Sequence, residues 1–274
     1  MRVKTIAEIG INHNGDIAIA KDLISIVKSS GCDYVKFQKR TPDKCVPEHQ
    51  KNVMRETPWG DMTYLEYKKR IEFGDEEYRE IDKHCEFVGI PWFVSVWDMN
   101  SIETSLKFRN KLVKIPSACI TDDRLLYVVK ATNIPAILST GMSDMEMVEK
   151  AVDILDGNVV CIMHCVSTYP SKPEEQNMNC ITTLKKKFPK IPIGFSNHFS
   201  GITYIPVAAA LGAEWIEYHV TLDRAMWGTD QAASFEPEAV FRVNKYLRNI
   251  EKGMGDGEKR ILEGEVPIMK KLRG

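Results

Sequence analysis

Polar residues of complementary chemistry recur two positions apart near the ends of apolar runs. Three such pairs occur: Lys36 with Gln38, Ser196 with His198, and Glu217 with His219. Residues two apart on a β-strand point in the same direction, so each pair can face one site. Ammonium, imidazole, carboxylate and hydroxyl groups together suit the binding of an anion beside a metal ion.

Two lysines in largely apolar runs indicate an anionic ligand. Lys36 lies in VKFQ and Lys114 in LVKIPS. A buried ammonium group is costly unless it is paired, and an anionic ligand would supply the partner. Hydroxyl groups at the ends of other runs favour recognition of phosphate or carboxylate. They belong to Ser95, Ser117, Ser139, Thr140, Ser167, Tyr169 and Ser196.

Two histidines indicate a metal site. His198 and His219 end neighbouring predicted strands, and imidazole is a suitable ligand for Mn, Fe, Zn or Co. A single histidine is more often a structural residue, but two at adjacent strand ends, with Glu217 nearby, favour a metal. His164 lies in the middle of a predicted strand, and we expect it to be interior or to support the site from behind.

Eight short runs rich in β-branched residues have to position these groups. Most of them are apolar on both faces where they begin, as expected of parallel strands that are covered on both sides. The predicted strands are residues 5–10, 34–38, 92–96, 112–117, 135–140, 159–166, 192–198 and 215–220.

Amphipathic helices are predicted between the strands. The first runs from Asp16 to Ser30 and stops at Gly31, a residue type that commonly follows a helix. Ser143, with Glu146 three residues later, predicts a capped helix that continues to Leu155. The other predicted helices are residues 75–88, 122–132, 181–188, 203–211 and 237–252.

The number and order of these elements predict an α/β fold, a (β/α)₈ TIM barrel, as a single domain over residues 1–274. A doubly wound sheet is less favoured, because EIGINHNG after the first strand is not a GxGxxG phosphate loop. The strand ends of a barrel meet on the face that carries the active site. Residues 39–74 form a long connection, either a lid over that face or a surface excursion packed on the rim. Residues 254–274 are expected to form a C-terminal tail.

Composition excludes several classes of protein. Hydrophobic residues make up 43% of the chain and charged residues 27%, which is ordinary for a globular protein. A formal net charge of -1 provides no basic field for nucleic acid, and no apolar run approaches the roughly 20 residues of a membrane span. The N-terminus shows no signal-peptide pattern. Seven scattered cysteines without a CxxC pair predict free thiols in a reducing, cytoplasmic location.

A series of ordered motifs resembles the sialic acid synthases of the NeuB or SpsE type, over almost the whole chain. The motifs are AEIGINHNG (7–15), VKFQ (35–38), LVKIPS (112–117), LSTGM (138–142), STYP (167–170), GFSNH (194–198), EYHVT (217–221), GTD (228–230) and SFEP (234–237). The resemblance implies a TIM-barrel transferase of carbohydrate (sialic acid) biosynthesis, such as an N-acetylneuraminate synthase. Such an enzyme condenses phosphoenolpyruvate with an N-acylhexosamine-type aldose, releases phosphate by C–O cleavage and yields a nonulosonic acid.

The resemblance also implies a role for each matching residue. His198 and His219 would hold a divalent metal, most often Mn²⁺, with Mg²⁺ or Co²⁺ as alternatives. Phosphoenolpyruvate would contact Lys36, Gln38, Ser95 and Lys114 through its carboxylate and Ser117, Ser139, Ser167 and Ser196 through its phosphate. The open-chain sugar would contact Glu8, Tyr169 and Asp230. Glu217 would lie between sugar and metal and is the expected general base, with Glu8 as the alternative.

Several positions depart from the family pattern, mostly on the side of the sugar. Ala118-Cys119 replaces Gly-Glu, Ser95-Val96-Trp97 replaces Thr-Pro-Phe, Gln231 replaces His, and Ser167 replaces Asn. The family's antifreeze-like C-terminal domain, whose arginine reaches the partner subunit's site, has no counterpart within the 274 residues. We therefore expect that role to fall to Arg40, Arg55 or Arg70, to a separate protein in trans, or to be made unnecessary by a different acceptor. The resemblance implies a homodimer.

Two other functions fit the same residues. One is another phosphoenolpyruvate-dependent synthase that makes a 3-deoxy-2-keto sugar acid from a different aldose, because the charges would be placed similarly. The other is a non-catalytic barrel that binds a sugar phosphate. The presence of both histidines, both lysines and Glu217 favours catalysis over binding alone.

Overall fold

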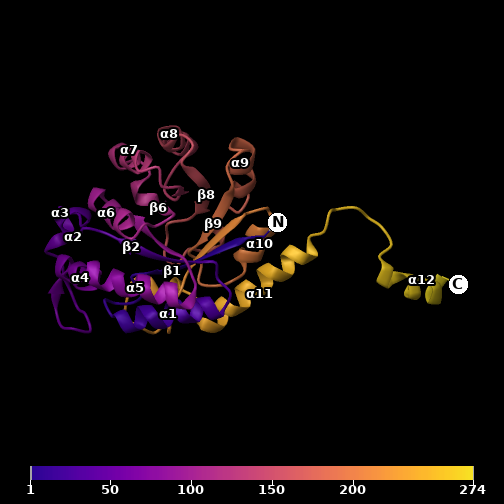
Figure 1. The fold of residues 1–274 in the computed structure, drawn as a ribbon, viewed down its shortest axis with the longest axis horizontal. Helices are drawn as coiled ribbons and strands as arrows, with labels where there is room; N and C mark the ends of the chain where they lie inside the picture. The colour runs from indigo at the N-terminus through magenta and orange to yellow at the C-terminus, as the bar shows by residue number, and fades with distance from the viewer. Residues whose placement is uncertain (1, 274) are drawn as a thin grey trace.

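Eight parallel strands form a closed barrel in this protein, which is described over residues 2–273 by a computed structural model (Figure 1). The strands follow one another around the barrel in the order β1, β2, β5, β6, β7, β8, β9 and β10 before β10 pairs with β1. Their bounds are β1 Lys4–Gly10, β2 Tyr34–Lys39, β5 Trp92–Val96, β6 Val113–Ile115, β7 Ala136–Ser139, β8 Val159–Cys165, β9 Ile193–Asn197 and β10 Trp215–His219. The predicted TIM barrel and its eight strands are confirmed. Met1 and Gly274, which the predicted domain includes, lie outside the described residues.

Helices surround the barrel and cover the outer faces of its strands (Figure 1). The helices predicted from amphipathic patterns are α1 Ile17–Ser29, α5 Asp75–Val88, α7 Asp123–Ala131, α8 Met145–Leu155, α9 Cys180–Lys187, α10 Tyr204–Ala210 and α11 Pro237–Gly253. Gly31 follows α1 with a φ of 84°, the left-handed conformation in which glycine is favoured.

Two details differ from the prediction. The structure contains a further helix, α6 Met99–Lys107, which Asp98 caps by accepting a hydrogen bond from the Ser101 amide. The predicted capping box of Ser143 and Glu146 is wrong, because Asp144 is the residue that caps α8, through the amide of Met147. Ser143 instead donates its hydroxyl to the carbonyl of Gly141, so an aspartate one residue later is left to satisfy the helix amides.

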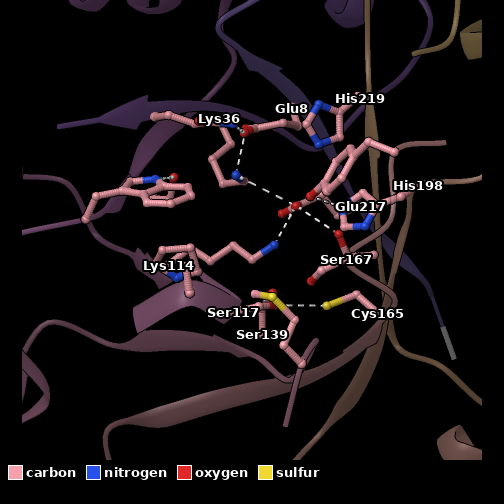
Figure 2. A pocket seen from close by; sticks show the side chains of 18 residues that line it. Glu8, Lys36, Lys114, Ser117, Ser139, Cys165, Ser167, His198, Glu217 and His219 are labelled. Carbon is pink, nitrogen blue, oxygen red and sulfur yellow. Dashed lines mark hydrogen bonds and ion pairs between the residues drawn. The ribbon is translucent and has the colours of Figure 1, made fainter. Parts of the chain in front are cut away.

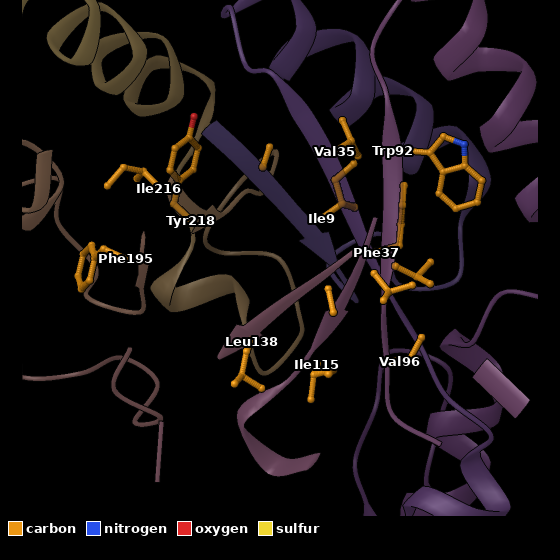
Figure 3. Close-up of a cluster of buried hydrophobic side chains, with 14 of the residues drawn as sticks. Ile9, Val35, Phe37, Trp92, Val96, Ile115, Leu138, Phe195, Ile216 and Tyr218 are labelled. Carbon is orange, nitrogen blue, oxygen red and sulfur yellow. The ribbon is translucent and has the colours of Figure 1, made fainter. Parts of the chain in front are cut away.

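The core has two parts, because successive strand residues point alternately into and out of the barrel. Outward-facing side chains pack under the helices, among them Ile9, Val35 and Tyr218 (Figure 3). A smaller cluster fills the amino-terminal half of the barrel interior and is made of Ile6, Phe93, Ile137, Cys161, Met163 and Trp215. The next inward position on most of these strands is polar, so the apolar plug forms the floor of a polar cavity.

The long connection at 39–74 is folded over the rim of the barrel. It contains α2 Pro42–Cys45, α3 Glu48–Lys51, a hairpin of β3 Met54–Arg55 and β4 Met62–Thr63, and α4 Tyr64–Ile71. Tyr67 and Ile71 of α4 are buried against Ile11. Asp98, at the start of α6, accepts hydrogen bonds from the backbone and side chain of Thr41. These contacts attach the connection to the carboxyl-terminal face of the barrel.

The last described residues extend away from the barrel. A stretch of exposed chain follows α11 and leads to α12 Val266–Arg273, which has no buried residue and stands clear of the barrel in Figure 1. Among residues 2–273, no helix has both the length and the apolar character that crossing a bilayer requires.

Candidate active site

A cavity of about 170 Å³ opens at the carboxyl-terminal ends of the barrel strands (Figure 2). The predicted site residues that line it are Glu8, Lys36, Gln38, Ser95, Lys114, Ser117, Ser139, Ser167, Tyr169, Ser196, His198, Glu217 and His219. Asp230 is the exception, because it lines a neighbouring cavity under the 39–74 connection. The structure therefore brings together side chains from strands far apart in the sequence.

Strand register places the polar groups in one layer above the apolar plug. Glu8 of β1 is opposite Lys36 on one side and His219 on the other. Ser95 is opposite Lys114, and Glu217 is opposite Ser196. Glu8, Ser95 and Glu217 each follow an inward apolar residue of the plug by two positions, as Glu8 follows Ile6. The alternation that buries the plug therefore also aims the polar side chains at the cavity.

Two buried ion pairs form the centre of the cavity. Lys36 Nζ lies 2.7 Å from Glu8 Oε2, and Lys114 Nζ lies 2.5 Å from Glu217 Oε1. Lys36 is also 3.7 Å from Glu217 Oε1, which links the pairs (Figure 2). Burial alone would raise the pKa of Glu217, but the ammonium groups of Lys114 and Lys36 outweigh burial and lower it. Glu217 is therefore a carboxylate at neutral pH.

Glu217 keeps one oxygen free. Its Oε1 accepts hydrogen bonds from Lys114 and from the hydroxyl of Ser196 at 3.1 Å. Its Oε2 is buried and has no hydrogen-bond partner among the described residues. A buried carboxylate oxygen without a donor has a strong demand for one, which a bound ligand or water can meet.

Serine hydroxyl groups line another part of the cavity wall. Ser139 Oγ is buried without a partner within residues 2–273, and Ser117 accepts a hydrogen bond from the Gly141 amide. Ser117 Oγ is 3.3 Å from the sulfur of Cys165, a cavity residue for which the sequence predicted only a free thiol. The spacing along β8 could have predicted this position. Cys165 lies two residues after Met163, which points into the barrel, so Cys165 points into it as well.

The two histidines lie side by side, with ring centroids 5.5 Å apart. His198 Nδ1 bonds to the carbonyl of Val166, which can only accept, so this nitrogen holds the proton and Nε2 is left as an acceptor. Burial, and then the neighbouring His219, lower the pKa of His198 to about 3, so the ring is neutral at physiological pH. The Tyr169 hydroxyl lies 2.9 Å from His198 Nε2.

These residues fit a metal ion with open coordination positions. Neutral imidazole is the metal-binding form of histidine, and a carbonyl bonded to its other nitrogen is the usual support. His219 Nδ1 is buried, has no hydrogen-bond partner among the described residues and lies 3.5 Å from Asp230 Oδ2. Within residues 2–273, however, no three His, Cys, Asp or Glu side chains are grouped to enclose a metal. Two histidines would therefore have to share the ion with water or substrate.

The other sequence predictions for this region have mixed outcomes. Trp97 and Met142 line the cavity although the sequence offered no chemical reason to select them. His164 lies outside the cavity with its Nε2 2.8 Å from the Gln176 carbonyl, which confirms an interior position. The cysteines within residues 2–273 are all free thiols, as predicted.

Comparison with known proteins identifies consistent relatives. The sequence matches the model of the NeuB family over residues 23–259. It is 34% identical to an N,N'-diacetyllegionaminic acid synthase of Legionella pneumophila, covering 98% of this chain and 78% of that protein. It is also 34% identical to the N-acetylneuraminate-9-phosphate synthase of Homo sapiens, covering 97% and 75% respectively. Among solved structures, an N-acetylneuraminic acid synthetase from Leptospira borgpetersenii, in complex with citrate, superposes with a TM-score of 0.87 at 28% identity, covering 100% of this chain and 93% of that one.

Proposed function

This chain belongs to the NeuB family, and from that premise we propose that it condenses phosphoenolpyruvate with an N-acylhexosamine-type aldose in a metal-dependent reaction. The family and the relatives make it an enzyme of the nonulosonic acid synthase type. The observation that supports the finer assignment best is the cluster of two lysines, two glutamates and two histidines in one cavity at the strand ends.

The electrostatics of the cavity suit phosphoenolpyruvate. This substrate has nearly three negative charges, and Lys36 and Lys114 are the cations that can offset them. In the ligand-free site these lysines are paired with Glu8 and Glu217. We expect the carboxylate of the substrate to take over part of this pairing, while its phosphate lies against the wall of serine hydroxyls. Transfer of the lysine contacts would leave Glu217 a stronger base than it is in the free enzyme.

The condensation forms one C–C bond and one C–O bond to water, and it breaks the C–O bond to phosphate. Carbon 3 of phosphoenolpyruvate attacks the aldehyde carbon of the open-chain sugar, whose oxygen takes up a proton and becomes a hydroxyl group, and water adds to the cationic carbon 2. Phosphate then leaves with the bridging oxygen, and loss of the remaining hydroxyl proton gives the 2-keto acid. Glu217 Oε2, which has no hydrogen-bond partner among the described residues, would accept the proton of the water, with Glu8 as the alternative base. The cavity also aligns the two reactants, which lowers the entropic cost of their encounter.

A divalent ion, proposed as Mn²⁺, would be held by His198 and His219. When bound, it would supply Lewis acidity toward the aldehyde oxygen. The Val166 carbonyl holds the His198 ring through Nδ1, whereas the Tyr169 hydroxyl occupies Nε2 in the ligand-free site and would turn away when the ion binds there. Asp230 lies 3.5 Å from His219 Nδ1. Tyr169 and Asp230 are expected to contact sugar hydroxyl groups.

Phosphoenolpyruvate labelled with ¹⁸O at its bridging oxygen tests this function. With Mn²⁺ and a panel of N-acylhexosamines and their 6-phosphates, we expect the enzyme to release phosphate that retains the label, because the C–O bond breaks. Mass spectrometry of the phosphate measures it. Label found in the organic product would exclude C–O cleavage. Absence of any aldose-dependent phosphate release would leave the non-catalytic binding barrel as the better assignment.

A second prediction concerns the serine wall. In Gly141→Ala, the new methyl group would collide with Ser167 Oγ and lie 2.9 Å from Ser117 Oγ, so both hydroxyls must turn away. We expect the KM for phosphoenolpyruvate to rise about tenfold, corresponding to one lost hydrogen bond to an anion. The melting temperature should change little, because only side-chain ends move. Gly253→Ala is the matched control, since its methyl group would meet no atom within 4 Å. An unchanged KM in Gly141→Ala would remove these serines from the phosphate site.

A further inference from the structure

A second cavity, of about 270 Å³, lies beside the first and under the 39–74 connection. Trp97 lines both cavities. Gln38 of the first accepts a hydrogen bond from Arg40 of the second, and Asp230 of the second lies 3.5 Å from His219 of the first. A ligand whose reacting end lies at Glu217 and the histidines can therefore extend past Trp97 into the second cavity.

Two cations of the second cavity, Lys68 and Arg40, have no carboxylate partner in the described part of the chain. Lys68 of α4 is only 8% exposed, and its Nζ lies 5.3 Å and 5.1 Å from the ring centres of Tyr64 and Tyr67. Among residues 2–273, no carboxylate oxygen lies within 4 Å of Lys68 or Arg40. The Arg40 guanidinium lies 3.8 Å from the centre of the Trp97 ring, and its Nε is buried without a hydrogen-bond partner.

The acidic groups of this cavity are already engaged elsewhere. Glu72 lies 2.8 Å from Lys39 and accepts a hydrogen bond from the Arg40 backbone amide. Asp230 accepts from Thr229 and faces His219. In the first cavity, by contrast, Lys36 and Lys114 each pair with a glutamate.

Burial, and then the charge of Arg40, lower the pKa of Lys68 to about 8, so its ammonium form predominates at pH 7. Unpaired buried cations are costly and indicate an anionic ligand.

We propose that Arg40 and Lys68 form a subsite for a phosphate monoester at the end of the acceptor sugar farthest from its aldehyde. This inference rests on the proposed function and names its acceptor class. Phosphoenolpyruvate supplies three carbons of a nine-carbon product, so carbon 6 of the hexosamine becomes carbon 9. A phosphate on carbon 6 is therefore as far from the reacting carbon as the sugar allows. Arginine can bind such a dianion through two N–H groups, and lysine adds a point charge. Of the three arginines considered from sequence, Arg40 is the one that lines this cavity, whereas Arg55 and Arg70 do not.

Binding of unreactive acceptors tests the subsite separately from catalysis. The probes are N-acetylmannosaminitol and N-acetylglucosaminitol, each with and without a 6-phosphate, because reduction to the alcohol removes the reacting aldehyde. Titration calorimetry of the wild-type enzyme should show at least tenfold tighter binding of a 6-phosphate than of its parent. Lys68→Gln and Arg40→Gln should each reduce that preference to threefold or less.

Lys69→Gln is the matched control, because Lys69 is the next residue of α4 but is exposed and paired with Asp43 at 2.7 Å. It should retain the preference of the wild type. A thermal melt of each variant shows whether it is folded. Because Lys68 and Arg40 are replaced separately, the test still works if one of the two variants does not fold. Equal binding of phosphorylated and parent alditols by the wild type would overturn the subsite, as would a preference retained in both variants. Neither result would affect the proposed condensation, which the labelled-phosphate assay tests on its own.

Discussion

Lys114→Met is expected to lower kcat/KM for phosphoenolpyruvate by about 1,000-fold, or ~4 kcal/mol. Two effects combine. The substrate loses a charge-assisted hydrogen bond from Lys114. Glu217 loses its 2.5 Å partner and remains buried as a carboxylate that Lys36 compensates only from 3.7 Å. Steady-state phosphate release, with calorimetric measurement of phosphoenolpyruvate affinity, separates the loss in binding from the loss in turnover.

A double variant distinguishes the substrate contact from general destabilisation. Lys114→Met alone should lower the free energy of unfolding by about 3 kcal/mol, because it leaves an unbalanced buried charge. Adding Glu217→Gln removes that charge, so most of the stability should return while kcat/KM stays at least as low as in Lys114→Met. Lys4→Met is the control lysine, since Lys4 lies over the Trp215 ring at the other end of the barrel. Wild-type kcat/KM in Lys114→Met would show that this lysine does not bind the substrate.

His198→Ala and His219→Ala are expected each to weaken Mn²⁺ binding by at least about 100-fold, and together to abolish it. Removing a group that hydrogen-bonds to a metal ligand typically weakens metal binding 10- to 100-fold. Loss of a direct ligand should weaken it at least as much. Each loss should be severe because, among the described side chains, no group of three or more potential metal ligands is present. Electron paramagnetic resonance of free Mn²⁺ measures binding without relying on turnover.

His164→Ala provides the control for these histidines. His164 is also buried in β8, but it bonds to the Gln176 carbonyl and faces away from the cavity. Its variant should bind Mn²⁺ as the wild type does, even if its melting temperature falls. If the double variant of His198 and His219 binds Mn²⁺ with unchanged affinity, the metal is not held by these residues.

The sequence was most informative where one strand places several groups. Lys36 with Gln38, and Glu217 with His219, share a side because backbone geometry alone sets the alternation. The barrel class followed from the number and order of apolar runs, since parallel strands covered by helices have a distinct pattern. Residues on loops were harder. Asp230 was grouped with the other sugar contacts from its motif, but the loop after β10 places it in the second cavity.

Local signals were less reliable where two residues compete for one role. Ser143 and Asp144 can both cap α8, and the choice depends on the Gly141 carbonyl, which takes the serine hydroxyl. The helix α6 was missed for a related reason. Its cap, Asp98, also bonds to Thr41 of the 39–74 connection, so part of what stabilises its start is a tertiary contact.

The strand and helix pattern, the polar strand ends and the kind of ligand that such ends can bind follow from the order of the amino acids. The pairing of the charges follows from the tertiary structure. Lys36 pairs with Glu8 of the neighbouring strand and Lys114 with Glu217 across the barrel, whereas Lys68 and Arg40 have no carboxylate within 4 Å in the described part of the chain. The reason is physical, because pairing depends on distances between elements that barrel closure sets. Apolar neighbours in the sequence predict that a lysine is buried and requires a charged partner. They do not predict which residue that partner is.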